Sequence, residues 1–159
     1  MSMYGPWDLE ERVEDAIVSF LKGLFTDIAM VEAAKTITDA SYPLVLVEAQ
    51  DSDNHNETGR FSGRRVIEID VIIITEALNF LGSTGSPASL RKAREHHRVI
   101  KNSIIFALAG NTVHTEVNAL DPEGVKFSQF AMGRQSRDAG DGKLVTIQTM
   151  ITIAQPKEL

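Results

Sequence analysis

Apolar residues recur at helical spacing in two segments of the chain. In residues 8–25 these positions are Leu9, Val13, Ala16, Ile17, Phe20, Leu21 and Leu24. The opposite face of this segment is predicted to carry Glu10, Glu11, Glu14 and Asp15. In the second segment, from Pro87 or Ala88 to Leu108, the stripe is Leu90, Ala93, His97, Ile100, Ile104 and Leu108, and Gly110 follows it. Both patterns predict amphipathic helices, the first capped by Asp8.

Runs of apolar residues with a period of two predict strands elsewhere. Leu44–Ala49 has no polar residue before Glu48, and Arg64–Thr75 alternates over most of its length. Leu144–Ala154 places Val, Ile and Thr on one face. Weaker alternation marks Thr112–Leu120 and Val125–Met132. The pattern between residues 26 and 43 fits a short helix or a strand equally well.

The remaining segments are polar. Residues 50–63 and 133–143 are predicted to be mobile loops, the second connecting the last two strands as a long hairpin. The resulting order of helices and strands predicts an α+β fold. We expect a mainly antiparallel sheet of about four to five strands, packed by two main helices, in a single domain that covers residues 1–159.

Composition narrows the classes of function. The net charge of −6 and isoelectric point near 5.2 argue against a surface that holds nucleic-acid backbone, which needs clustered Lys and Arg. The chain has no cysteine, which excludes disulfides and thiolate chemistry. Residues 1–7 lack the pattern of a signal peptide, and the longest strongly apolar run, Val71–Ile74, is too short to cross a bilayer. We therefore expect an intracellularly assembled protein without a membrane span.

The acidic and histidine residues do not form a known metal motif. A calcium-binding EF-hand loop starting at Asp51 would need Gly and Glu where the chain has Asn56 and Ser62. His96 and His97 are adjacent, so on a helix they point about 100° apart and do not share a metal ion. His97 lies on the apolar stripe and is predicted to be a partly buried core residue. We expect no metal and no cofactor.

Catalytic motifs are also missing. The glycine-rich, basic segment Gly59–Arg65 lacks the Gly-Lys-Ser/Thr ending of a P-loop and precedes a strand rather than a helix. No Gly-x-Ser-x-Gly sequence marks a serine nucleophile. Glu68 and Asp70 share one strand face, which resembles a paired-carboxylate acid/base site, although two acids on a solvent-facing or subunit-facing strand are commoner. The chain is therefore not expected to be an enzyme.

Several of these residues suit a protein interface instead. Arg and aromatic residues are enriched at interfaces, and the patch Arg60, Phe61, Arg64 and Arg65 has that character, although a mobile loop is an equal reading. The other interface candidates are Glu68, Asp70, Arg134 and Arg137. The second helix is also predicted to present a basic face. By default this face is solvated, and the alternative is that it meets the acidic face of the first helix in a neighbouring subunit. The basic face consists of Arg91, Lys92, Arg94, Arg98 and Lys101.

The order of these features resembles the tail terminator (tail completion) proteins of long-tailed bacteriophages. An amphipathic helix starts near Asp8, and the strand opening Tyr42-Pro43-Leu-Val-Leu-Val-Glu48 follows. A polar loop, the regular strand Arg65–Thr75 and the basic helix Arg91–Leu108 come next. A terminal hairpin carries the polar connection Gly133–Lys143. The resemblance covers nearly the whole chain, as a pattern of elements without a diagnostic motif.

This resemblance implies a homo-hexameric ring that caps the tail tube, stops its growth and joins it to the head-side connector in the virion, after assembly in the host cytoplasm. The partners would be other copies of the chain, the tail tube protein and the connector. DNA would be only passing cargo in the lumen, where an acidic surface does not hold it. The alternatives are another head–tail connector or neck protein, or a small α+β enzyme or ligand-binding domain that uses Glu68, Asp70 or His97.

Overall fold

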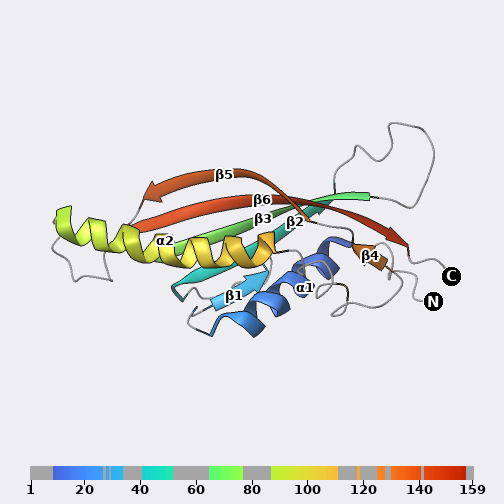
Figure 1. Ribbon diagram of the computed structural model, residues 1–159, viewed down its shortest axis with the longest axis horizontal. Coiled ribbons are helices and arrows are strands. Elements are labelled where there is room, and N and C mark those ends of the chain that lie inside the picture. Colours follow the sequence, from blue (N-terminus) through green and yellow to red (C-terminus); the bar gives the residue numbers. More distant parts are fainter. Residues whose placement is uncertain are drawn as a thin grey trace.

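The computed structural model describes residues 9–26, 28, 30–33, 41–51, 65–76, 87–110, 118, 125–127, 130–140 and 142–156. In chain order the elements are α1 (Leu9–Leu24), β1 (Met30–Ala33), β2 (Leu44–Asp51), β3 (Arg65–Glu76), α2 (Pro87–Ala109), β4 (Val125–Phe127), β5 (Ala131–Gly140) and β6 (Lys143–Pro156). Figure 1 shows them as a long twisted sheet with the two helices along one side.

The strands form one sheet in the order β1-β2-β3-β6-β4, and β5 also pairs with β6. β1 runs parallel to β2, and all other pairings are antiparallel. β3 and β6 pair from Arg65↔Ala154 to Glu76↔Lys143 and form the centre of the sheet. The predicted α+β fold with a mainly antiparallel sheet and two helices is confirmed. The short strands β1 and β4 bring the described sheet to six strands, where four to five were expected.

The core lies on one face of the sheet, which we call the inner face. On β3, Ile67, Ile69, Val71 and Ile73 are fully buried, whereas the residues between them are exposed or partly exposed. Successive side chains of a strand point to opposite faces, and β-branched residues pack well on a pleated surface. This strand therefore joins a dry inner face to a partly solvated outer face.

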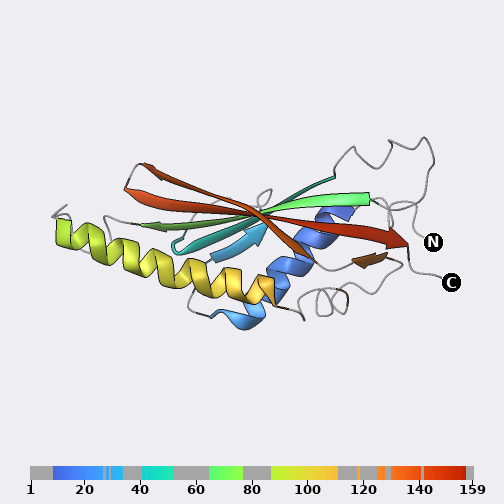
Figure 2. The same cartoon turned by 45° about the horizontal axis from the view of Figure 1, so that its top comes forward.

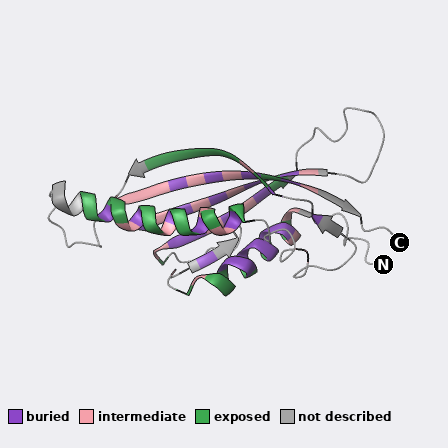
Figure 3. Cartoon of the chain, in the orientation of Figure 1, coloured by how far each residue is buried: buried purple, intermediate pink, exposed green. Residues whose placement is uncertain are grey.

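Both helices cover the inner face. α1 packs against β1 and β2, and α2 packs against β3 and β6. Figures 1 and 2 show the two helices on the same side of the sheet, and Figure 3 shows their buried residues turned toward it. Val13, Ile17 and Leu21 of α1 and Ile104 and Leu108 of α2 are fully buried in this core. The two predicted helices are thus confirmed, and so are most of their apolar stripes, but Leu24 at the end of α1 is 53% exposed.

One residue of α1 lies on the opposite side from its predicted position. Glu14 was assigned to the solvent face, but it is only 1% exposed, and its carboxylate accepts a hydrogen bond of 3.0 Å from the N–H of Ala49. β1 pairs with β2 only as far as Val47, so Ala49 lies beyond the end of β1. A buried backbone N–H without a partner is costly. Glu14 therefore satisfies a donor that no strand reaches.

The predicted loop Gly133–Lys143 is a second correction, because most of it is strand β5. Gly140 pairs with Lys143, which leaves a two-residue turn at 141–142, and Gly142 adopts the left-handed backbone conformation (φ 71°) typical of such turns. The hairpin partner of β6 is thus β5. The predicted strand Val125–Met132 is interrupted: β4 ends at Phe127, and β5 begins at Ala131.

Near its start, β5 contains a bulge that side chains of β6 stabilise. The pairing register with β6 shifts in this region. Thr149 Oγ1 donates a hydrogen bond of 2.8 Å to the carbonyl of Arg134, and Gln148 Nε2 donates one of 3.2 Å to the carbonyl of Gly133. A Cβ atom at Gly133 would lie 2.8 Å from Thr149 Oγ1, too close for any side chain there. The bulge therefore requires glycine at this position.

Other expectations fall largely outside the described residues. Within the ambiguous segment 26–43, Met30–Ala33 forms β1. Of the predicted strand Thr112–Leu120, the structure describes Asn118, whose side-chain amide exchanges two hydrogen bonds with the backbone of Phe127 at 2.7 and 2.8 Å. Of the predicted mobile loop 50–63, residues 50 and 51 belong to β2 and the rest lie outside the described residues.

Candidate functional site

The predicted interface residues fall into three groups. Arg60, Phe61 and Arg64 lie outside the described residues, and Arg65 is the first residue of β3. Glu68 and Asp70 point to the outer face of the sheet, with Glu68 exposed and Asp70 partly exposed. Arg134 and Arg137 are exposed on β5. Among the described candidates, the acidic pair therefore lies on β3 with Arg65, and Arg134 and Arg137 lie on β5.

The acidic candidates form part of a cluster with a residue that the sequence did not single out. Glu48 of β2 stands directly opposite Asp70 of β3, and Glu68 follows two residues away on the same face. We call Glu48, Glu68 and Asp70 the acidic cluster. Burial raises the pKa of Asp70 above its ordinary value, and the neighbouring charges of Glu48 and then Glu68 raise it further. Like charges directly opposite on a sheet are destabilising, so this cluster costs the isolated subunit stability.

Apolar residues border the acidic cluster on both sides. Leu46, Ile72 and Ile147 stand opposite one another across β2, β3 and β6. On the other side, Val66 pairs with Ile153. All five side chains are partly exposed. Charged residues surrounded by partly exposed apolar side chains are typical of an interaction surface rather than of a purely solvated face.

The solvent side of α2 carries apolar and basic residues together. Val99 is 66% exposed and Phe106 is 83% exposed, and the two lie two helical turns apart on one side of the helix. Arg98 is exposed next to Val99, and Arg91 forms an exposed ion pair of 3.6 Å with Glu95. The sequence pattern predicted the basic residues of this surface, but it did not identify Val99 and Phe106, which are outside the apolar stripe of the helix.

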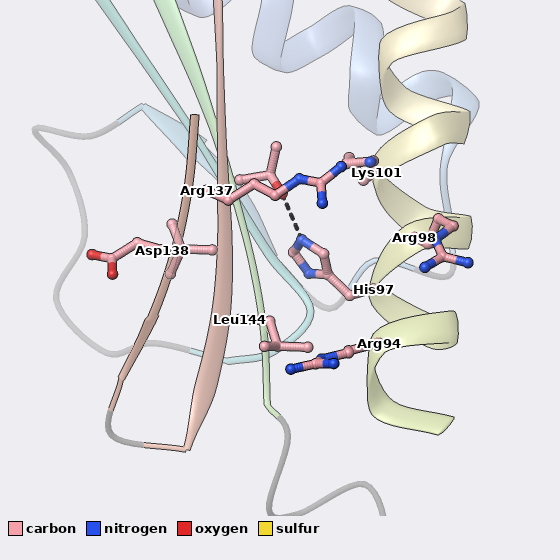
Figure 4. A pocket seen from close by; sticks show the side chains of 9 residues that line it. Arg94, His97, Arg98, Lys101, Arg137, Asp138 and Leu144 are labelled. Atoms are coloured by element: carbon pink, nitrogen blue, oxygen red, sulfur yellow. Dashed lines mark hydrogen bonds between the residues drawn. The ribbon is translucent and has the colours of Figure 1, made fainter. Parts of the chain in front are cut away.

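A recess of about 330 Å³ lies between α2 and the β5–β6 hairpin (Figure 4). We call it the basic pocket. It is lined by Arg94, His97, Arg98, Lys101, Arg137, Asp138, Leu144, Val145 and Thr146. Asp138 is the one acidic residue in this lining, and Figure 4 shows its carboxylate pointing to the side of the hairpin away from α2. The lining therefore includes three arginines and one lysine, although the net charge of the whole chain is negative.

His97 forms the inner wall of the basic pocket. Its side chain is hydrogen-bonded through Nδ1 to Thr75 Oγ1 at 2.8 Å and through Nε2 to Thr146 Oγ1 at 2.7 Å. Hydroxyl groups both donate and accept, so they satisfy the neutral ring in either tautomer. Burial lowers the pKa of His97, and the positive charges of Lys101, His96 and Arg137 lower it further. The prediction that His97 is a buried core residue is confirmed at 9% exposure.

Lys101 departs from the prediction that it belongs to a solvated basic face. It is only 8% exposed and lines the pocket beside His97. Burial lowers the pKa of its ammonium group, and the charges of Arg137 and Arg98 lower it further. The reason for its position is the sheet edge, because Lys101 lies on the side of α2 that faces β6, and the side chain of Arg137 on β5 extends toward it.

Metal centres and membrane-spanning helices are both absent from the described part of the chain. No group of three or more potential protein ligands is close enough to hold a metal ion there. No helix in that part is both long and apolar enough to span a membrane. Glu68 and Asp70 lie on the outer face, whereas His97 lies under α2 on the inner face, so these three residues do not share one site. Neither a comparison with models of protein families nor a search of curated proteins finds a match to this chain.

Proposed function

We propose that this protein is a structural subunit of a bacteriophage virion, a tail terminator that forms a ring on the end of the tail tube. The ring would stop tube growth and join the tube to the head-side connector. Its partners would be further copies of itself, the tail tube protein and the connector. The resemblance to tail terminators implies six copies in the ring. The order of elements in the chain supports this proposal, and the α+β fold is compatible with it.

The observation that carries the proposal is a pair of complementary surfaces on opposite sides of the subunit. The outer face of the sheet combines the acidic cluster with partly exposed apolar residues. The solvent side of α2 combines Arg98 with the exposed Val99 and Phe106. Each surface offers what the other lacks, because carboxylates match guanidinium groups and both have apolar area to bury. A contact between these surfaces joins the subunits head to tail.

Head-to-tail contacts have a definite consequence for assembly. Because each copy uses two different surfaces, every added copy leaves one surface of each kind free. Such contacts produce a closed ring when the rotation between neighbours closes, and a filament when it does not. A ring of acidic subunits also suits the passage of DNA, since its net negative charge of −6 per chain opposes adhesion of the phosphate backbone. DNA would then be cargo rather than a ligand.

Two alternatives remain with their own supporting features. A different connector or neck protein would use the same head-to-tail surfaces, and binding to tail tubes separates it from a terminator. A ligand-binding domain is favoured by the basic pocket, whereas an enzyme that combines Glu68, Asp70 and His97 is disfavoured by their positions on opposite faces of the sheet.

The mode of association is tested by mixing two variants. Asp70→Arg breaks the acidic surface, and Phe106→Asp breaks the α2 surface. If contacts are head to tail, each variant alone is monomeric, and an equal mixture forms dimers because one intact surface of each kind remains. Light scattering during size-exclusion chromatography measures the mass. Asp15→Arg, on the exposed side of α1, is the matched control and should assemble as the wild type does.

The function itself is tested with tail tubes. Wild-type protein added to polymerising tail tube protein should shorten the tubes and appear as a ring at one end in electron micrographs. Some rings form only on the tube, so a monomer that becomes a terminal ring there supports the proposal. A protein that neither alters tube length nor binds tube ends contradicts it, even if the protein forms oligomers by itself.

A further inference from the structure

The basic pocket contains a charge imbalance, and of its cations only Arg98 also belongs to the α2 surface of the proposed ring. Arg94, Arg98, Lys101 and Arg137 line it, and the single carboxylate of its lining points away from α2. These cations come from two elements distant in the sequence, α2 and β5, so the fold itself brings them together. Like charges that converge in a recess repel one another unless an anion joins them.

Lys101 is the strongest indication that the pocket takes a ligand. The residue as a whole is only 8% exposed, and no hydrogen bond or ion pair joins it to another described residue. An ammonium group removed from water without a counter-ion is costly, and lysine is almost never fully buried unless it is paired. The cost is retained in this fold although an apolar residue of similar length would remove it.

The other walls of the pocket define the chemistry of the ligand. His97 has both ring nitrogens engaged by Thr75 and Thr146, so it contributes a fixed, neutral surface rather than a base. The groups that remain able to bind are N–H donors of guanidinium and ammonium groups, which recognise oxygen anions. The volume of about 330 Å³ is at the lower end for ligand pockets, so it suits a small group.

We propose that the basic pocket is a binding site for a phosphate group, held by Lys101 of α2 and by Arg137 of β5. Phosphate presents several oxygens to donors that arrive from α2 on one side and from β5 on the other. A bound phosphate group connects the hairpin to the helix. The site is independent of the proposed ring, because Lys101 and Arg137 belong to one subunit and neither of them takes part in the proposed contact between subunits.

The phosphate group has two possible sources, which separate arms of the test distinguish. One is inorganic phosphate or a small phosphorylated molecule, and the other is the backbone of a nucleic acid. Lys101 is only 8% exposed, so a terminal phosphate group that enters the recess end-on reaches it more readily than an internal phosphodiester does. We therefore expect binding of inorganic phosphate and of an oligonucleotide with a 5′-phosphate, and no binding of the same oligonucleotide without it.

The test compares the full-length protein with Lys101→Met by calorimetric titration with inorganic phosphate, at constant ionic strength set with chloride. Wild type should bind one phosphate per chain, and Lys101→Met should lose at least about tenfold in affinity, the effect of one charge-assisted contact. Lys92→Met is the matched control, because Lys92 is exposed on the same helix and does not line the pocket. Arg137→Gln should weaken binding, and Arg134→Gln on the same strand should not.

Thermal unfolding provides a second measurement. A variant that simply failed to fold would not give the result expected here. Without phosphate, Lys101→Met should unfold at a higher temperature than wild type, since it removes a buried charge. With phosphate, the wild type should gain more stability than this variant. Phosphate also stabilises proteins in general by exclusion from their surface, so the difference between the two proteins is the informative quantity. Equal responses of wild type and Lys101→Met to phosphate, or absence of heat on titration of the wild type, would overturn the proposal.

Discussion

On the inner face of the sheet, His97 is hydrogen-bonded to two threonine hydroxyls, and Glu14 accepts a hydrogen bond from a backbone N–H. On the outer face, Asp70 stands opposite Glu48, and no cation among the described residues lies beside it. Both faces therefore contain partly or fully buried polar groups. On the inner face the polar groups are satisfied within the subunit. On the outer face, burial and then repulsion from Glu48 and Glu68 raise the pKa of Asp70.

The difference separates groups that stabilise the subunit from groups that are available to a partner. Buried polar groups normally have hydrogen-bond partners, and exceptions often coincide with binding sites, where stability is lower than the fold permits. By this criterion the acidic cluster on the outer face and Lys101 in the basic pocket belong together, and Glu14 and His97 belong to the scaffold. Substitutions in the two groups should therefore change stability in opposite directions.

The largest effect is expected at Glu14. Glu14→Ala leaves the N–H of Ala49 buried without an acceptor and creates a cavity next to β2, so the free energy of unfolding should fall by about 2–3 kcal/mol. Urea denaturation measures the change. Glu14→Gln keeps an oxygen acceptor, so its free energy of unfolding should fall by less than half as much as that of Glu14→Ala. If Glu14→Ala were as stable as the wild type, the assignment of Glu14 to the scaffold would be wrong.

The second effect concerns pH and His97. Because the folded pKa of His97 is lower than its ordinary value of 6.5, the unfolded chain binds a proton more readily than the folded one. Stability should therefore fall as the pH decreases through 6.5 toward the folded pKa, by at most about 1.4 kcal/mol per pH unit for this one proton. His97→Gln should remove that part of the slope between about pH 8 and about pH 5 in urea denaturation. An unchanged slope would contradict the role given to burial here.

A smaller effect of opposite sign is expected at Asp70. Its folded pKa is raised, so ionisation at neutral pH weakens the folded state, and this penalty is absent below the pKa of the unfolded chain. Asp70→Asn should therefore stabilise the subunit by about 0.5–1 kcal/mol at pH 7, with the gain disappearing in acid. The same substitution should weaken self-association measured by light scattering. Asp15→Asn on α1 is the control for both measurements.

The smallest effect on stability is expected at Phe106. With 83% of the residue exposed, Phe106→Ser should change the free energy of unfolding by less than about 0.5 kcal/mol. Self-association should nevertheless decrease markedly, because an exposed aromatic side chain contributes mainly when a partner buries it. Phe106→Leu should retain most of the association. If Phe106→Ser associated as strongly as the wild type, the α2 surface would not be part of the contact between subunits.

The pattern of apolar and polar residues was sufficient to predict the main helices and strands. α1, α2, β2, β3 and β6 were predicted within a few residues, because a helical stripe or a run of β-branched residues directly records which side is buried. β5 was missed because its side chains are polar and exposed, so its sequence has no alternation to detect. The Asp141-Gly142 dipeptide, a strong hairpin signal between two strands, was the evidence in the sequence that would have located its turn.

The sequence by itself thus determined the elements, their buried faces and the absence of familiar catalytic motifs. Tertiary structure alone decided what the polar residues do. Glu14 is buried because β1 ends before Ala49, and Lys101 is buried because the β5–β6 hairpin packs beside α2. Glu48 faces Asp70 because of the register between β2 and β3. Burial of an apolar face follows from local periodicity, whereas the surroundings of a charge depend on residues far away in the chain, since electrostatic and hydrogen-bond partners are brought together only by folding.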